Sequence, residues 1–240
     1  MSGSLRKYLT PKNYLRYGAR VLGLDYRKSY AQNGEDILID FIFRALKTQH
    51  PSYIDIGAHD PIHKSNTALF YRRGSRGINV EANPLLFKRF LRKRPGDINL
   101  NIGIAPQSGT LDFYVMNNPG LSTFSKEEAE RLVREHGYAI ASVYPVEVRT
   151  FRDVIDQYAD GTCPDLLTID TEGLDEEILR SIDFTAHRPK VICVETISFS
   201  RTRDGIKDEK LIGFLKEQGY TLIADTYINS LFVDARIWKE

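Results

Sequence analysis

Four apolar segments of the sequence end in acidic residues, and these ends carry the side chains best suited to chemistry. The ends are Asp55-Ile-Gly57-Ala-His59, Glu81-Ala-Asn83-Pro84, Asp170-Thr-Glu172-Gly173 and Glu195-Thr196. If the segments are parallel strands of one sheet, their carboxyl ends meet at one edge, where open α/β sheets bind ligands. Carboxylates and a histidine gathered there could bind hydroxyl groups, accept protons or hold a cation.

The second of these ends suggests a nucleoside. A carboxylate at this position, here Glu81, can accept hydrogen bonds from both hydroxyls of a ribose. Gly57, which has no Cβ, would let a cofactor come close to the backbone of the first end. Either feature alone is also typical of a structural helix cap. Together they favour a cofactor that contains a nucleoside.

The loop after Gly57 indicates which cofactor this is. Dinucleotide enzymes need the pattern G-x-G-x-x-G so that pyrophosphate can lie on a helix N-terminus. Here Ala58-His59-Asp60-Pro61-Ile62 follows without a further glycine, and Asp60 would repel a pyrophosphate. S-adenosylmethionine has no phosphate, and its ammonium and sulfonium groups tolerate carboxylates such as Asp55. The sequence therefore favours S-adenosylmethionine.

Strand-like and helical segments alternate along most of the chain and would position these ends. The predicted strands cover residues 53–56, 77–80, 98–104, 166–169 and 191–194, and the predicted helices cover 66–73, 85–94, 175–182 and 211–218. Short apolar strands separated by helices indicate an α/β fold with a mainly parallel, doubly wound sheet covered on both faces. The segments 220–224 and 230–233 are predicted to close the chain as an antiparallel hairpin.

Two regions stand apart from this alternation. Residues 109–115 and 143–148 are predicted as extra strands beside a helix over 126–136, so an insertion at about 109–149 would form part of a substrate cap. Residues 1–28 contain seven Lys or Arg and a single acid, Asp25, and are predicted to form a basic helical arm. Residues 29–240 then form one domain.

Composition excludes several classes of protein. The chain has 240 residues, of which 42% are hydrophobic and 27% charged, as in ordinary globular domains. No apolar run approaches the roughly 18–20 residues of a membrane span, and we expect no signal peptide at the start. Cys163 and Cys193 lie in apolar surroundings and are interpreted as core residues in a reducing compartment. We therefore expect a cytoplasmic protein.

The net charge of +1 conceals two opposed halves. Residues 1–100 hold 18 basic and 8 acidic side chains, whereas residues 101–240 hold 15 and 24. The near-neutral total and the absence of an Asn-Pro-Pro-Tyr-type motif argue against a nucleic-acid substrate. The basic half could hold a phosphate-bearing substrate, touch an acidic membrane surface through the arm, or pair with the acidic half in a homodimer. A basic cluster in this half is interpreted as a solvated helix face: Arg89, Arg92, Lys93 and Arg94.

Six blocks of the sequence carry a resemblance to a known family. They are Ser29-Tyr-Ala-Gln32-Asn33-Gly34-Glu35-Asp36, Tyr53-Ile-Asp55-Ile-Gly57-Ala-His59-Asp-Pro61, Ser65-Asn66-Thr67, Arg76-Gly77-Ile-Asn-Val-Glu81-Ala-Asn83-Pro84, Ser122-Thr123-Phe124-Ser125 and Ile169-Asp170-Thr-Glu172-Gly173-Leu-Asp175. In their order and spacing they resemble the FkbM family of S-adenosylmethionine-dependent methyltransferases. The resemblance implies a Rossmann-like methyltransferase fold and methyl transfer to a hydroxyl. The branch it resembles is associated with bacterial surface polysaccharide synthesis, which implies a sugar acceptor, nucleotide-linked or glycan-linked.

The resemblance and the strand ends together give a set of expected cofactor-binding residues. These are Asp55, Gly57, Ser65, Asn66, Glu81, Asn83, Gln32 and Glu35. We assign Glu81 to the ribose, and Asn83 either to the adenine or to the turn before Pro84. Ser65 and Asn66 would cap the next helix or touch the carboxylate of the cofactor. Gln32 and Glu35 would cap a helix or form a lid.

A sugar hydroxyl must be activated before it can attack a methyl group. Asp170 or Glu172 could remove its proton, and His59 is the alternative base, because a histidine pKa of about 6.5 suits the task. Asp170 and Glu195 could instead hold Mg²⁺ or Mn²⁺ through carboxylate oxygens.

Two functions of other classes compete with methyl transfer. A nucleotide-dependent oxidoreductase could use the same sheet, although the glycine pattern for a dinucleotide is missing. A non-catalytic module that binds a glycan or a protein partner could retain the fold without the chemistry.

Overall fold

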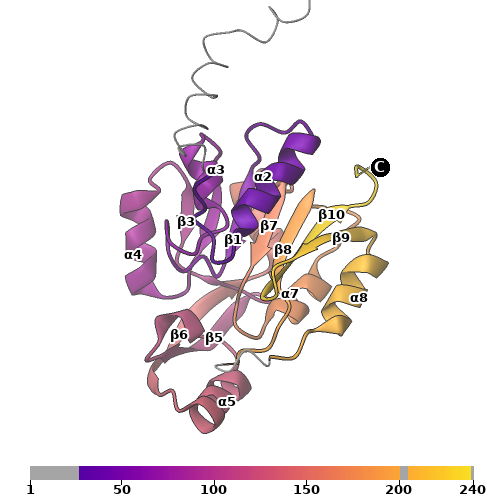
Figure 1. Ribbon diagram of the computed structural model, residues 1–240. Helices are drawn as coiled ribbons and strands as arrows, with labels where there is room; N and C mark the ends of the chain where they lie inside the picture. Colours follow the sequence, from indigo (N-terminus) through magenta and orange to yellow (C-terminus); the bar gives the residue numbers. More distant parts are fainter. Residues whose placement is uncertain (1–26, 201–204, 239–240) are drawn as a thin grey trace, which may run out of the picture.

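The computed structural model describes residues 27–200 and 205–238, and its centre is a seven-stranded sheet (Figure 1). Its strands, in spatial order, are β3 (Ile98–Leu100), β2 (Gly77–Val80), β1 (Tyr53–Ile56), β7 (Leu166–Ile169), β8 (Val191–Glu195), β10 (Asn229–Asp234) and β9 (Tyr220–Asp225). The strands from β3 to β8 are parallel, and β10 runs antiparallel to β8 and β9. The mainly parallel sheet and the C-terminal hairpin are confirmed. The strand order reverses between β1 and β7, which is where such sheets bind ligands.

Helices cover both faces of this sheet. They are α2 (Glu35–Ala45), α3 (Ala68–Arg72), α4 (Pro84–Lys93), α6 (Phe151–Tyr158), α7 (Asp175–Ser181) and α8 (Glu209–Glu217). Alternate strand residues belong to two separate cores: Tyr53 packs with residues of α2 and α3, whereas Ile54 packs with residues of α6, α7 and α8. Strands buried on both faces explain the continuous apolar runs of the sequence.

A second, three-stranded sheet forms a lobe beside the central sheet, at the bottom of the view in Figure 1. The lobe contains β4 (Gly103–Ile104), β5 (Gly109–Met116), β6 (Ile140–Arg149), a 3₁₀ turn (Pro119–Leu121) and α5 (Lys126–His136). The predicted single strand over 98–104 is therefore wrong, because its two halves belong to different sheets. Asn101 separates the halves: its side-chain amide donates to the carbonyls of Glu81 (2.8 Å) and Ala82 (2.9 Å) and turns the chain into the lobe.

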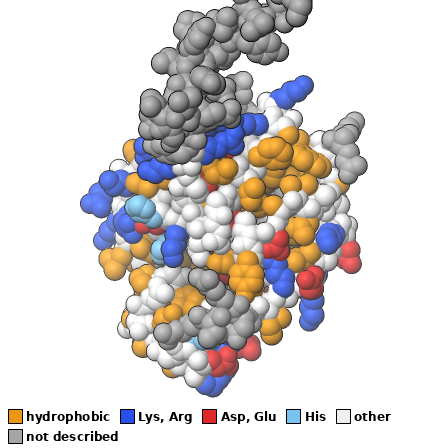
Figure 2. Space-filling model, in the orientation of Figure 1, with side chains coloured by type: hydrophobic (Ala, Val, Ile, Leu, Met, Phe, Trp, Pro, Cys, Tyr) orange, Lys and Arg blue, Asp and Glu red, His pale blue; other side chains and the backbone are white. Residues whose placement is uncertain are grey.

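The basic side chains of the N-terminal half of the chain gather on one side of the surface. Figure 2 shows Lys and Arg side chains gathered over the side of the molecule where α3 and α4 lie. Apart from Arg27 and Lys28, the predicted basic arm over residues 1–28 lies outside the described residues. Within the described ranges, no helix has the length and apolar character that crossing a bilayer demands.

The prediction that Arg94 belongs to a solvated basic face of α4 is wrong, because Arg94 is buried. Its side chain is 1% exposed, and it donates hydrogen bonds from all three guanidinium nitrogens. The acceptors are the carbonyl of Pro61 (2.8 Å), the hydroxyls of Ser65 (2.7 Å) and Thr67 (2.6 Å), and the side-chain carbonyl of Asn79 (3.0 Å). Arg94 therefore fastens the end of α4 to the loop between β1 and α3.

We expect Arg94→Met to lower the free energy of unfolding by about 3–5 kcal/mol, because it leaves several buried acceptors without a donor and removes the charge beside buried Asp97. Urea denaturation measures the change. Arg92→Met is the matched control, since Arg92 is exposed near the same end of α4 and should change stability by less than about 0.5 kcal/mol. Equal effects of the two variants would contradict the structural role of Arg94.

Candidate active site

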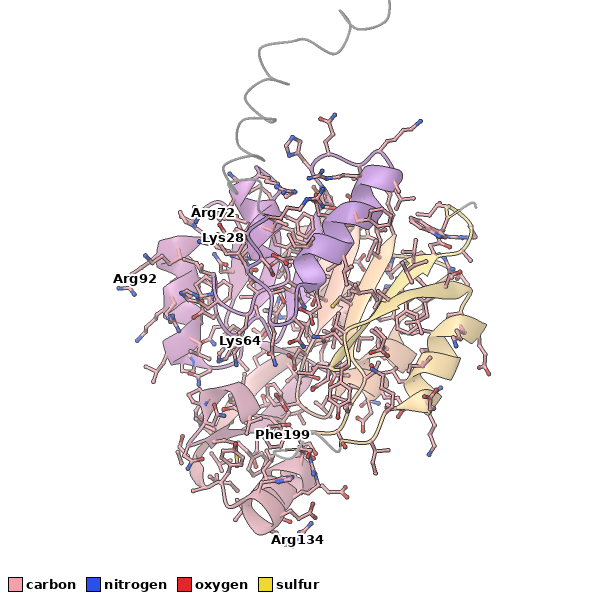
Figure 3. All side chains as sticks on the ribbon, in the orientation of Figure 1. Lys28, Lys64, Arg72, Arg92, Arg134 and Phe199 are labelled. Carbon is pink, nitrogen blue, oxygen red and sulfur yellow. The ribbon has the colours of Figure 1, made fainter. Side chains whose placement is uncertain are left out.

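A cavity of about 730 Å³ opens at the carboxyl ends of β1, β2, β7 and β8, a volume within the range of about 300–1,000 Å³ typical of small-molecule sites. The strand ends line one side of it. Residues of the lobe, among them Phe113, Leu121 and Phe124, line another. Figure 3 shows Lys64 and Phe199 between the central sheet and the lobe, whereas Arg92 lies at the outer margin.

The cavity brings together most of the residues predicted to bind or react. The predicted residues that line it are Gln32, Asp55, Gly57, His59, Ser65, Asn66, Glu81, Asp170, Glu172 and Glu195. They come from segments far apart in the sequence and meet because parallel strands end at one edge of the sheet. Their roles toward a ligand stay predictions.

Asn83 and Glu35 are the two predicted residues that the structure places behind the cavity lining. The side chain of Asn83 accepts a hydrogen bond from the backbone N–H of Leu85 (3.0 Å) and caps α4. The buried carboxylate of Glu35 accepts from the hydroxyl of Thr226 (2.8 Å) and the side-chain amide of Asn229 (3.0 Å). Glu35 thereby positions Thr226, which lines the cavity and which the sequence reasoning missed.

Gly57 is required by a close approach of two backbones. Its φ is +77°, and a Cβ built on it would lie 1.8 Å from the carbonyl oxygen of Asp170. The end of β7 thus occupies the space that a side chain would take, while Gly57 itself still lines the cavity, and its approach by a cofactor stays a prediction. Any larger residue at this position would push the β1 loop away from β7.

Glu81 joins the loops that follow β1 and β2. One of its carboxylate oxygens accepts from the backbone N–H of His59 and the other from that of Asn83, both at 2.7 Å. Burial raises the pKa of Glu81 to about 7, and the two N–H donors oppose that rise because they favour the charged form. Each oxygen keeps a lone pair for a further donor, such as a ribose hydroxyl.

Three carboxylates crowd the ends of β7 and β8. Asp170, Glu172 and Glu195 each have an oxygen within 4.8 Å of the others. Desolvation inside the cavity, and secondarily the repulsion from neighbouring carboxylates such as Asp175, raises the pKa of all three, to about 7 for Asp170, although solvent still reaches the Asp170 side chain through the cavity. Such a group of acids can hold a proton near neutral pH, accept one from a substrate, or bind a divalent cation.

His59 also lines the cavity and lies in the loop that follows β1. Burial lowers the pKa of His59, although the nearby Asp60 acts in the opposite direction. The ring is therefore neutral at pH 7 and able to accept a proton. Asp60 itself is paired with Arg89 at 2.5 Å and accepts from the backbone N–H groups of Ile62 and His63, both at 2.8 Å, so it fixes the loop.

We predict that the ligand-free protein loses stability as the pH rises from about 5 to 8. The unfolded chain releases carboxyl protons at about pH 4, whereas in the folded chain the pKa is raised to about 7 for Glu81 and Asp170 and well above its usual value for Glu172 and Glu195, so these protons are released only at higher pH. Each such proton lowers the free energy of unfolding by up to about 1.4 kcal/mol per pH unit in that interval. His59, with its lowered pKa, contributes a smaller change of the opposite sign.

Urea denaturation at pH 5, 6, 7 and 8 measures this dependence. Glu172→Gln should flatten it and raise the stability at pH 8. Glu217→Gln, on the exposed surface of α8, should leave it unchanged. A stability that rises steadily across this range would contradict the raised pKa values.

The chain matches one family model, described as the methyltransferase FkbM domain, over residues 55–222. No curated protein matches the chain significantly. Among solved structures, a TehB-like SAM-dependent methyltransferase from Corynebacterium glutamicum is 12% identical with a TM-score of 0.43, covering 93% of this chain and 97% of that one. The methyltransferase FkbM from Methylobacillus flagellatus is 14% identical with a TM-score of 0.44, covering 77% and 44%.

The two structural similarities are too distant to bear on activity, so the family match stands by itself. It begins at Asp55, the acid at the end of β1, and continues into β9. It thus includes the ends of β1, β2, β7 and β8 that line the cavity. Because residues 55–222 make up more than half of the chain, the protein belongs to the FkbM methyltransferase domain family, a family of S-adenosylmethionine-dependent methyltransferases.

Proposed function

We propose that the protein transfers the methyl group of S-adenosylmethionine to a hydroxyl of a sugar that is nucleotide-linked or glycan-linked. One observation carries the proposal. A single cavity holds Glu81, a carboxylate at the end of β2 where it could bind a ribose, together with three further acids at the ends of β7 and β8. The resemblance to the branch associated with surface polysaccharide synthesis supports a sugar as acceptor.

The side of the cavity formed by the ends of β1 and β2, which we call the donor side, offers a matching group for each part of S-adenosylmethionine. The free lone pairs of Glu81 can accept the two ribose hydroxyls. Ala82, Leu86 and Ile102 also line the cavity and offer an apolar surface for the adenine. Asp55, whose carboxylate accepts from the hydroxyl of Thr67 at 2.6 Å, contributes negative charge for the cationic methionine end. The bound donor supplies a methyl group on a positively charged sulfur.

We expect Glu81→Gln to weaken binding of S-adenosylhomocysteine by at least about tenfold, because a neutral amide replaces a charged acceptor of two hydrogen bonds. Isothermal titration calorimetry gives the dissociation constants. Glu217→Gln on the surface of α8 is the control and should bind like the wild type. Normal binding by Glu81→Gln would remove Glu81 from the donor site.

The acceptor side combines acids with an aromatic ring. Phe199 lines the cavity near Glu195 in the sequence and packs against Tyr138 of the lobe. Carboxylates accept hydrogen bonds from sugar hydroxyls, and an aromatic face packs on the apolar face of a sugar ring. We therefore assign the lobe over residues 109–149 to the cap of the acceptor site.

Asp170 is the base that we favour. Methyl transfer to a hydroxyl is an in-line displacement, and the hydroxyl becomes a good nucleophile only as it loses its proton. A carboxyl with a pKa of about 7 is partly ionised at neutral pH and still basic enough to accept that proton. Glu172, Glu195 and the neutral His59 are close enough to the cavity to orient the hydroxyl.

We predict that Asp170→Asn lowers kcat at least about 100-fold while S-adenosylhomocysteine still binds, because the change removes the base but keeps the shape. Transfer of a labelled methyl group to a panel of nucleotide sugars measures kcat. His59→Gln tests the alternative base. If His59→Gln abolishes transfer and Asp170→Asn does not, His59 is the base.

A divalent cation is the alternative way to activate the hydroxyl. The oxygens of Asp170, Glu172 and Glu195 lie close enough to share one ion, and all-oxygen ligands suit Mg²⁺ or Mn²⁺. The base mechanism predicts unchanged turnover after dialysis against EDTA. Turnover that is lost on dialysis and restored by Mg²⁺ or Mn²⁺ would assign these acids to a cation instead.

A further inference from the structure

Lys64 stands out among the residues that line the cavity. The lining contains five carboxylates, those of Asp55, Glu81, Asp170, Glu172 and Glu195. Among the described lining residues, Lys64 is the only lysine or arginine. It is exposed and forms no hydrogen bond or ion pair with any described residue. A basic group surrounded by acids but bound to none of them is available for a ligand.

The backbone beside Lys64 is held firmly although its side chain is free. The next residue, Ser65, is buried, donates its N–H to the carbonyl of Tyr30 (2.9 Å) and accepts from Arg94 (2.7 Å). On the other side, Asp60 fixes the loop through the N–H groups of Ile62 and His63. Lys64 itself has a φ of +55°, so the fold directs its side chain from a fixed point toward the space between the sheet and the lobe (Figure 3).

The charges of the methyl donor suit a positive group at the position of Lys64. Its methionine end carries an ammonium, a sulfonium and a carboxylate. The acids of the cavity attract the two cations, but they repel the carboxylate. Lys64, the one lysine or arginine among the described lining residues, can offset this repulsion.

We propose that the Lys64 ammonium binds the carboxylate of the methionine end of S-adenosylmethionine. This inference rests on the proposed function, because it requires the donor to occupy the cavity with its ribose at Glu81. It adds a charged contact that selects donors with an intact amino acid over nucleosides without one.

The position of Lys64 favours the donor over an anionic acceptor. Lys64 lies in the loop between β1 and α3, on the same loop system as Gly57 and next to Ser65 and Asn66. Its positive charge offsets part of the rise in the pKa of Asp170 and adds to the lowering of the pKa of His59, whereas the charged neighbour that acts on the pKa of Glu81 is Asp55. Lys64 is thus placed toward the reacting end of the donor and away from the ribose end.

The test compares two ligands that differ only in the amino-acid part. S-adenosylhomocysteine has the carboxylate and the ammonium, and 5′-methylthioadenosine has neither. We expect Lys64→Met in the full chain to weaken S-adenosylhomocysteine about 10- to 100-fold in calorimetry and methylthioadenosine less than about threefold. Loss of a positive charge cannot weaken binding of the ammonium, so a selective loss reports the carboxylate. Lys64→Arg should restore most of the affinity.

Two controls separate the possible failures. Lys88→Met, on the exposed side of α4 outside the cavity, should bind both ligands like the wild type. Glu81→Gln should weaken both ligands alike. Equal affinity of wild type and Lys64→Met for S-adenosylhomocysteine, or an equal loss for both ligands, overturns the Lys64 contact and leaves the proposed function standing. A wild-type protein that binds neither ligand overturns the proposed function and this inference together.

Discussion

The buried guanidinium of Arg94 is the interaction on which the β1 side of the cavity depends. Arg94 donates to the hydroxyl of Thr67, and Thr67 in turn donates to the carboxylate of Asp55 at the end of β1. The same guanidinium holds the carbonyl of Pro61 and the hydroxyl of Ser65. Because a buried charge must have its donors satisfied, the helix end, the loop and the strand end are placed together. Moving any one of them would leave a buried polar group unpaired.

The acids at the strand ends work against folding in the absence of a ligand. Burial disfavours the charged forms of Asp170, Glu172 and Glu195, and their proximity adds repulsion. Glu172 also has a φ of +54°, a conformation that is uncommon for a residue with a side chain. Strain and repulsion concentrated in one place are typical of active sites, where the ligand supplies the compensating interactions.

The sequence predicted the strand ends well because their signal is local. An apolar run followed by an acid placed Glu81 and Asp170 at the correct edge of the sheet. The sequence failed where a residue takes its role from a distant partner. Arg94 looks like its exposed neighbours on α4 until the β1 loop is packed against it. The role of Lys64 could not be predicted, because the sequence of a loop does not show whether its lysine faces bulk water or a cavity.

The bond between Glu35 and the C-terminal hairpin bears on how the protein is made. Glu35 precedes β1 in the chain, yet one of its carboxylate oxygens accepts from Thr226 and Asn229, which leave the ribosome almost two hundred residues later. In a nascent chain that has emerged only as far as β8, the Glu35 carboxylate keeps only its local hydrogen bond from the backbone N–H of Asn33, and its other oxygen lacks both of its partners in the hairpin. Such a chain also lacks Thr226 in the cavity wall. Synthesis must therefore be nearly complete before this cavity can close, and a partly made chain should depend on chaperones during that interval.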